Sequence, residues 1–193
     1  HSATDIAEAV RFTASANLSV AVQATGHGVV RPANDSLLIV TSHMTHVVVN
    51  PDARTAWISA GAKWGKVLTQ AQAVGLAPLL GSSPDVGAIG YTLGGGMGWL
   101  ARKYGLSIGS GNCLEGVAAD GQIVLTRTER DADGGVAGQR GGDRVDVAEV
   151  HRERVVGLGA EGEGDGRCGR SQEDVGVLVG PSEVVGDEPA DLE

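Results

Sequence analysis

The chain has 193 residues, of which 41% are hydrophobic and only 3% aromatic, and its formal net charge is −9. Residues 1–127 are nearly neutral, with 8 Lys/Arg and 7 Asp/Glu, whereas residues 128–193 are acidic, with 7 Arg and 17 Asp/Glu; neither part has the basic surplus typical of nucleic-acid binding. No apolar run reaches the roughly 18 residues of a membrane span, and the two cysteines form no disulfide framework, so we expect reduced thiols, a cytoplasmic location and neither a nucleic-acid nor a membrane partner.

The N-terminal part of the chain begins with a helix and two apolar runs. Residues 4–16 carry apolar side chains at helical spacing, and Thr4 or Asp5 can cap this helix. The runs 18–22 and 36–41 are typical of buried strands. Together these elements predict a small α/β layer.

The next segments predict a hairpin, a helix and a second hairpin. Residues 46–50 and 55–61 flank a Pro-Asp turn signal, which favours an antiparallel pair. Residues 64–75 have helical periodicity and end in a glycine that suits a C-cap. Residues 113–126 contain two short apolar runs around an Asp-Gly turn signal, which predicts another hairpin.

Between these hairpins lies the glycine-rich segment 81–105, which reads GSSPDVGAIGYTLGGGMGWLARKYG. The segment contains more apolar residues than a flexible glycine-rich linker does. Residues 98–105 are expected to be helical. Such glycines allow backbone N–H groups to approach a bulky, phosphate-bearing ligand. The segment has neither the dinucleotide fingerprint nor the Gly-Lys-Ser/Thr of a P-loop, and a tight loop without a ligand remains the alternative.

Three histidines in the first part of the chain could carry chemistry. His27 stands in T-G-H-G directly after an apolar run, where glycines on both sides permit a tight turn that presents the imidazole to a ligand. The alternative is a histidine in an ordinary surface turn. His43 and His46 have a spacing that a metal could use on a helix, but strand-like residues follow and no third ligand is evident, so we expect no metal site.

Residues 128–193 differ in composition from everything before them. Val, Ala, Gly, Asp and Glu fill 47 of these 66 positions, and all five have codons that begin with G. Amino acids whose codons begin with G or C fill 62 of the 66, which is the bias that a shifted reading frame of a GC-rich gene would produce. We therefore divide the chain at residue 127 and interpret the second part as a frameshifted, largely disordered tail with an isolated helix or strand. A natural acidic tail is the alternative.

Several motifs occur in a fixed order within residues 1–127: T-G-H-G, D-x-L-L-I-x-T, R-T-A-x-I-x-A-G-A-x-W-G and G-S-S-P-x-V-G-x-x-G-Y-T-L-G-G-G. This order resembles the FAD-linked oxidases of the vanillyl-alcohol oxidase type, and most closely their berberine-bridge-like bacterial branch. The resemblance implies an α+β (α/β) fold, namely the first α/β subdomain and part of the second subdomain of a PCMH-type FAD-binding domain.

The resemblance also implies which residues bind the cofactor FAD. The loop around the pyrophosphate would be Gln23, Ala24, Thr25, Gly26, His27 and Gly28. The residues close to the flavin and phosphates would be Gly81, Ser82, Ser83, Gly87, Gly90, Gly94 and Gly95. Val117 would meet the adenosine end through its backbone, and His27 matches a histidine that many members bond covalently to the flavin 8α-methyl group.

This chain departs from the family pattern at several positions. Ser83 stands where bicovalent members have cysteine, so at most one covalent bond, through His27, is expected. Gln23 stands where the family often has arginine, and Gly109-Ser110 stand where it usually has Asp-Asn. The substrate domain that supplies the catalytic base in the family is not recognisable after residue 127, so we predict no catalytic residue.

The function implied by the resemblance is that of the FAD-binding portion of an oxidase. A small organic substrate of unknown identity would give a hydride to the flavin, and O2 would accept the electrons. Two alternatives stay open. One is an inactive truncated fragment, or an FAD-binding module without catalysis, and the other is a reductase that uses NADPH.

Overall fold

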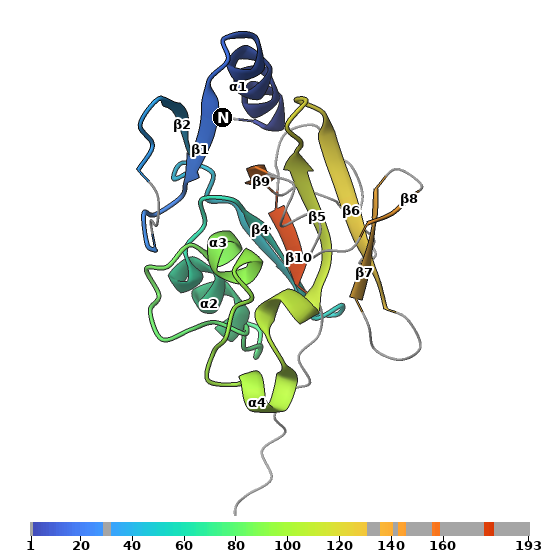
Figure 1. Ribbon diagram of the computed structural model, residues 1–193. Helices are drawn as coiled ribbons and strands as arrows, with labels where there is room; N and C mark the ends of the chain where they lie inside the picture. Colours follow the sequence, from blue (N-terminus) through green and yellow to red (C-terminus); the bar gives the residue numbers. More distant parts are fainter. Residues whose placement is uncertain are drawn as a thin grey trace, which may run out of the picture.

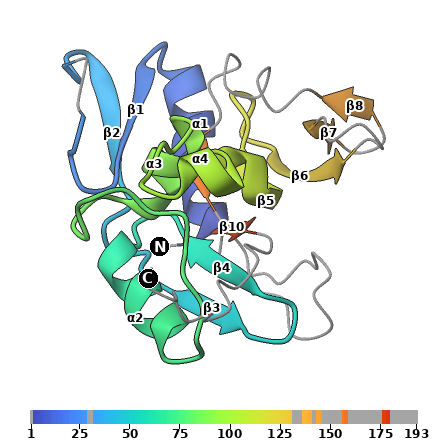
Figure 2. The same cartoon turned by 90° about the horizontal axis from the view of Figure 1, so that it is seen from below.

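The computed structural model describes residues 2–28, 32–130, 136–140, 143–145, 156–158 and 176–179, with side-chain surroundings up to residue 125. Helices and strands are mixed along the chain, which confirms the predicted fold class. Figure 1 shows a small layer of α1, β1 and β2 beside a larger sheet that carries α2, α3 and α4. Figure 2 shows β1 and β2 side by side, apart from that sheet.

The small layer consists of α1 (Ala3–Ser15), β1 (Ser19–Gln23) and β2 (Ser36–Val40). The strands are parallel, with Ser19 opposite Ser36. Helix α1 starts earlier than predicted because Ser2 is its N-cap. The Ser2 hydroxyl accepts a hydrogen bond from the Asp5 backbone N–H (3.3 Å), and the Asp5 carboxylate accepts one from the Ser2 N–H (2.7 Å). This reciprocal capping box corrects the prediction that Thr4 or Asp5 is the cap.

The larger sheet begins with the predicted antiparallel hairpin of β3 (Val47–Asn50) and β4 (Thr55–Ser59). The second hairpin pairs β5 (Gly111–Val117) with β6 (Ile123–Arg130), and Gly121 at its turn has φ +77°. Short strands complete the sheet in the order β3-β4-β10-β5-β6-β7-β8, with β9 paired to β5. Their bounds are Val136–Arg140 for β7, Asp143–Val145 for β8, Val156–Leu158 for β9 and Gly176–Val179 for β10.

The helices of the larger layer are short. Helix α2 (Trp64–Gln72) lies over β3 and β4 and is followed by Gly75 with φ +72°. Helix α3 (Ala88–Leu93) was not predicted, because its glycine-rich sequence lacks helical apolar periodicity. Helix α4 (Ala101–Tyr104) is shorter than the predicted 98–105 and is followed by a 3₁₀ helix at Ser107–Ser110.

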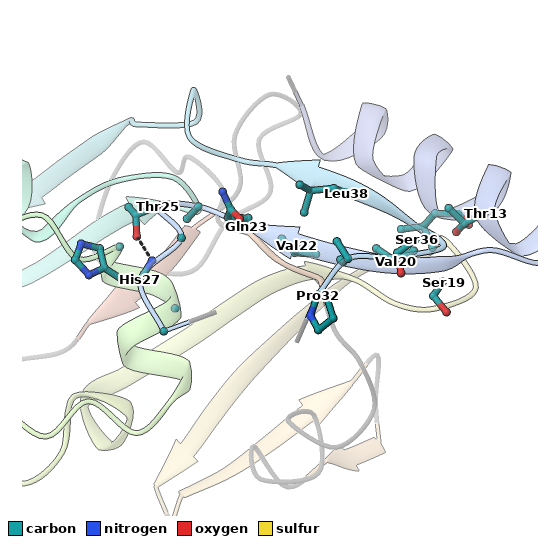
Figure 3. Close-up of a pocket in the computed structure, with 18 of the residues that line it drawn as sticks. Thr13, Ser19, Val20, Val22, Gln23, Thr25, His27, Pro32, Ser36 and Leu38 are labelled. Carbon is teal, nitrogen blue, oxygen red and sulfur yellow. Dashed lines mark hydrogen bonds between the residues drawn. The ribbon is translucent and has the colours of Figure 1, made fainter. Parts of the chain in front are cut away.

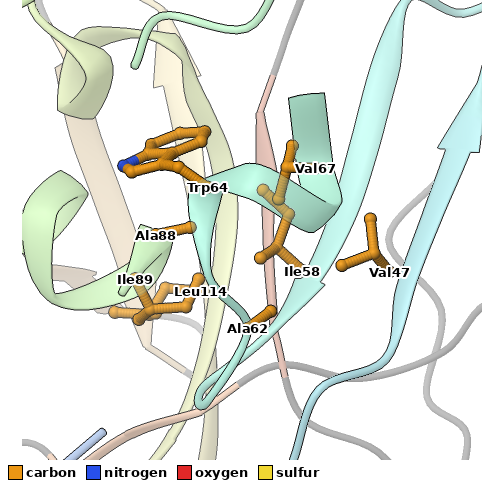
Figure 4. Close-up of a cluster of buried hydrophobic side chains, with 8 residues drawn as sticks. All are labelled: Val47, Ile58, Ala62, Trp64, Val67, Ala88, Ile89 and Leu114. Atoms are coloured by element: carbon orange, nitrogen blue, oxygen red, sulfur yellow. The ribbon is translucent and has the colours of Figure 1, made fainter. Parts of the chain in front are cut away.

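Two hydrophobic clusters form much of the core, and one of them joins the two layers. In the first, Ile6, Ala7 and Val10 of α1 pack with Val117 of β5, so the helix bridges both layers. In the second, shown in Figure 4, Trp64 lies among the buried side chains of the larger layer. The labelled members of the second cluster are Val47, Ile58, Ala62, Trp64, Val67, Ala88, Ile89 and Leu114.

Parts of the predicted tail and the cysteine prediction can be compared with the structure. The described parts of residues 128–193 are all strands, and the prediction of disorder for the remainder lies outside the described residues. Cys113 in β5 is disulfide-bonded, which contradicts the expectation of reduced thiols. None of the helices in the described part of the chain is long and apolar enough to cross a membrane.

Candidate functional site

A cleft of about 810 Å³ runs along β1 between the small layer and the start of α3. Figure 3 shows side chains of α1, β1 and β2 along it, with His27 beyond the end of β1. Its walls combine apolar side chains such as Val22 and Leu38 with the polar groups of Gln23, Thr25 and His27. Ligand sites commonly have volumes of roughly 300–1,000 Å³, so this cleft has room for a large cofactor.

The loop that follows β1 forms one end of the cleft and contains the T-G-H-G motif. All six residues predicted to surround a pyrophosphate line the cleft: Gln23, Ala24, Thr25, Gly26, His27 and Gly28. Gly26 and Gly28 have φ of +79° and +69°, a conformation that other residues rarely adopt, so both glycines are needed for this turn. The His27 side chain is exposed, and its backbone N–H points to the Thr25 hydroxyl oxygen at 3.4 Å. The turn therefore presents the imidazole to the cleft and to solvent.

The opposite wall comes from the glycine-rich segment, at Gly87, Gly90 and Tyr91. A Cβ atom on Gly87 would lie 3.4 Å from the Ala24 Cβ atom, so the two loops approach closely there. A Cβ atom on Gly90 would meet nothing within 4 Å, which leaves that backbone open toward a ligand. The two segments that sequence reasoning singled out separately thus form one site.

The other predicted residues of the glycine-rich segment do not line the cleft. Gly81 packs against the Tyr91 ring, because a Cβ atom at this position would lie only 3.0 Å from Tyr91 Cε2. Gly94 is the C-cap of α3, and Gly95, with φ +101°, follows it. Ser82 and Ser83 lie in the loop before α3, outside the cleft lining. Of these positions, Gly81 and Gly94 lie against Tyr91, a residue of the cleft wall.

Val117, the predicted adenosine contact, is also absent from the cleft lining. Its side chain is completely buried in the cluster beneath α1. Ala119, two residues later in the turn between β5 and β6, does line the cleft. The hairpin of β5 and β6 therefore contributes to the cleft through its turn, at Ala119, and not through β5.

Several cleft residues were not predicted. Pro32 precedes β2 and Tyr91 lies within α3, whereas α1 contributes Thr13 to the far end of the cleft. Side chains of a strand alternate between its two faces, so the sequence of β1 could have indicated which residues share a face. It could not indicate which of the two faces lines the cleft. Burial raises the pKa of the Tyr91 phenol above its ordinary value.

The charged side chains that the structure describes near the site lie beside the cleft rather than in its lining. None of the described residues that line the cleft is Lys, Arg, Asp or Glu. At its edge, Lys63 Nζ lies 2.9 Å from the Asp85 carboxylate, and the hydrogen bond and charge of Lys63 lower the pKa of Asp85, with His27 adding to the effect. Among the residues that the structure describes, no group of three His, Cys, Asp or Glu side chains could hold a metal ion.

These features fit a dinucleotide cofactor. Gly26, Gly28 and Gly90 expose backbone that can approach phosphates, and Gln23 and Thr25 offer neutral hydrogen-bonding groups beside it. The apolar stretch of β1 can cover the rings of such a molecule. Among the described residues that line the cleft, backbone N–H groups and polar side chains such as those of Gln23 and Thr25 would meet the phosphate charge.

Comparison with known proteins shows the family of this chain. A family model described as "FAD binding domain" matches residues 1–127. The chain is similar to (R)-6-hydroxynicotine oxidase from Paenarthrobacter nicotinovorans, with 33% identity over 127 residues, or 64% of this chain and 27% of that protein. It is also similar to berberine bridge enzyme-like 2 from Arabidopsis thaliana, with 30% identity over 131 residues, or 64% of this chain and 24% of that protein.

Among solved structures, the chain is similar to 6-hydroxy-D-nicotine oxidase from Arthrobacter nicotinovorans. The TM-score is 0.62 at 30% identity, and the match covers 65% of this chain and 28% of that chain. The chain thus spans about a quarter of the length of the curated relatives it matches.

Proposed function

This chain belongs to the PCMH-type FAD-binding domain family of FAD-dependent oxidoreductases, and on that premise we propose that it is the FAD-binding portion of an oxidase. FAD is the cofactor of this family, and when bound it supplies the hydride-accepting chemistry. The partners that we propose are a small organic substrate and O2 as electron acceptor. The names of the similar oxidases support this proposal.

One observation carries the proposal most directly. The T-G-H-G turn and the open backbone at Gly90 face the same cleft, although they lie far apart in the sequence. A surface turn or a purely structural glycine loop would not require the two segments to meet. Gly26, Thr25 and Gln23 would hold the phosphates, and the apolar residues of β1 would exclude water from the ring systems.

We further propose that His27 holds the flavin covalently. Its imidazole is exposed at the mouth of the cleft, and the glycines on both sides leave space for a bulky group against it. In the proposed bond, an imidazole nitrogen of His27 would replace a hydrogen of the methyl group. The methyl C–H and the imidazole N–H would each lose a proton, and the two electrons would pass to the flavin ring and then to O2, the acceptor already proposed. Ser83 cannot form a thioether, so this bond would be the single covalent attachment.

The experiment is reconstitution of the chain with FAD. After removal of free FAD, we expect the protein to retain flavin absorbance, and part of that absorbance to stay with the acid-precipitated protein. His27→Asn should keep bound flavin but lose the acid-stable fraction. His43→Asn is the matched control, because His43 does not line the cleft. A colourless protein after FAD addition would favour the fragment without cofactor binding over our proposal.

The remaining alternatives concern chemistry rather than fold. An FAD-binding module without catalysis would hold flavin but show no reduction by any substrate. A reductase would show rapid flavin reduction by NADPH in stopped-flow absorbance, whereas the oxidase that we propose would not. The cytoplasmic location stays a prediction.

We also propose that a shift of reading frame near residue 127 produced the acidic C-terminal part. The change in composition supports this proposal, and so does the family match, which ends at residue 127. Sequencing the gene tests it. Family-like sequence in another frame downstream of Arg127 is expected, and an intact frame of ordinary composition would contradict the proposal.

A further inference from the structure

The segment between α3 and α4 presents two large apolar side chains to solvent. Met97 is 79% exposed and Trp99 is 83% exposed, more than any other large hydrophobic side chain among the described residues. The other methionine of the chain, Met44, is only 6% exposed and belongs to the buried cluster beneath α1. The two methionines therefore differ sharply in their access to small solutes.

The exposure of Met97 follows from the glycines on either side of it. A Cβ atom on Gly96 would lie 2.7 Å from the Ser107 Oγ atom, and a Cβ atom on Gly98 would overlap the Leu80 carbonyl oxygen. The Ser107 N–H also donates a hydrogen bond to the Gly96 carbonyl oxygen (3.0 Å). The backbone of both glycines therefore packs closely against neighbouring segments. This packing directs the Met97 side chain between them toward solvent.

This segment also adjoins the cofactor cleft. The Tyr91 hydroxyl would be 3.1 Å from a Cβ atom on Gly98, and Tyr91 Cε1 would be 2.9 Å from one on Gly96. Tyr91 itself lines the cleft. Met97 therefore lies between two glycines that both pack against Tyr91, a residue of the cleft wall.

A thioether in this position can react with peroxide. We propose that Met97 is a modification site at which hydrogen peroxide converts the thioether to methionine sulfoxide. The sulfur gains one oxygen atom and is oxidised by two electrons, while the peroxide is reduced to water. Hydrogen peroxide is what O2 becomes on accepting two electrons and two protons, so its source rests on the proposed oxidase function, whereas the reactivity of Met97 does not.

The sulfoxide would change the surface and leave the fold intact. The Met97 side chain is largely in solvent, so a polar oxygen on it displaces little buried apolar contact. At Met44 the same change would place a polar group in the core beneath α1, at a cost in stability. Modification at Met97 should therefore leave the unfolding midpoint unchanged.

The test treats the full chain with a limited amount of hydrogen peroxide and follows both methionine peptides by mass spectrometry. We expect Met97 to be converted at least about tenfold faster than Met44, because a buried thioether reacts only after local opening. In urea-unfolded chain the two rates should become equal. In Met97→Leu, uptake of the first oxygen atom should slow to the Met44 rate. Equal rates in the folded chain, or conversion of Met44 first, would overturn the inference.

A second experiment tests whether the bound flavin produces the peroxide, independently of whether Met97 reacts with it. FAD-loaded chain is photoreduced without air and then reoxidised by air in the presence of catalase, which removes peroxide that escapes into solution. Met97 sulfoxide formed under these conditions supports peroxide production at the cleft. If Met97 reacts with added peroxide but air fails to reoxidise the reduced flavin, the site stands and the proposed oxidase function fails.

Discussion

Replacing Gly61 with alanine tests the contact that joins the two layers. Gly61 follows β4, and its N–H donates to the Met44 carbonyl oxygen (2.8 Å). The Met44 N–H donates to the Thr41 carbonyl oxygen (2.8 Å), and the Thr41 N–H donates to that of Gln23 (2.9 Å). This series of backbone hydrogen bonds links the larger sheet to the residue where the T-G-H-G loop begins.

A methyl group has no room in this contact. The Cβ atom of Gly61→Ala would overlap the Thr41 carbonyl oxygen and lie 2.7 Å from the Thr41 carbonyl carbon, both of them main-chain atoms. Overpacking costs about 1–3 kcal/mol, and a buried hydrogen bond left unmade costs about 1–3 kcal/mol more. We therefore expect Gly61→Ala to lower the free energy of unfolding by about 2–6 kcal/mol, a large fraction of the roughly 5–15 kcal/mol typical of a domain.

Urea unfolding followed by far-UV circular dichroism measures this change. Gly109→Ala is the matched control, because Gly109 is exposed and a Cβ atom there meets nothing within 4 Å. The control should unfold within about 0.5 kcal/mol of the unmodified chain. The reasoning is refuted if Gly61→Ala and Gly109→Ala unfold at the same urea concentration.

Two further substitutions test smaller contacts. Gly121→Ala should destabilise the chain by about 1–3 kcal/mol in urea unfolding, because φ is +77° and the new methyl group would lie 2.5 Å from Arg11 Cγ; an unchanged midpoint would contradict the contact between α1 and the second hairpin. Because Lys63 lowers the pKa of Asp85 below 3.8, the pair stabilises the fold above that pH, and the effect is lost as the pH falls through the lowered pKa. Asp85→Asn should therefore slightly lower the free energy of unfolding at neutral pH and low salt. Both side chains are exposed, so this decrease should disappear in high salt and at low pH, and a decrease of equal size at every pH and salt concentration would exclude the ion pair as its cause.

Local features of the sequence predicted most of the elements. Apolar spacing identified α1 and α2, and turn signals identified the hairpins of β3 with β4 and β5 with β6. The sequence did not predict helix α3, because its glycine-rich segment lacks helical apolar periodicity. The position of this helix depends on burial of Ala88 and Ile89 beside Trp64. Propensity is a weak guide wherever tertiary contacts decide the conformation.

The sequence also singled out the two segments of the site but not the orientation of their residues. Gly81 and Gly90 both stand in the glycine-rich segment, yet one packs against the Tyr91 ring and the other faces open space. Likewise, nothing in the order of residues 94–100 distinguishes Met97 from a core methionine such as Met44.

The chain by itself determined the T-G-H-G turn and the strands before and after it, because each depends on a short window of residues. Only the tertiary structure decided that His27 and Gly90 share one cleft, that Val117 lies in the core beneath α1, and that Met97 faces solvent. These outcomes depend on which backbones approach closely enough to exclude a side chain. Such proximity arises from packing between segments distant in sequence, which a local pattern does not encode.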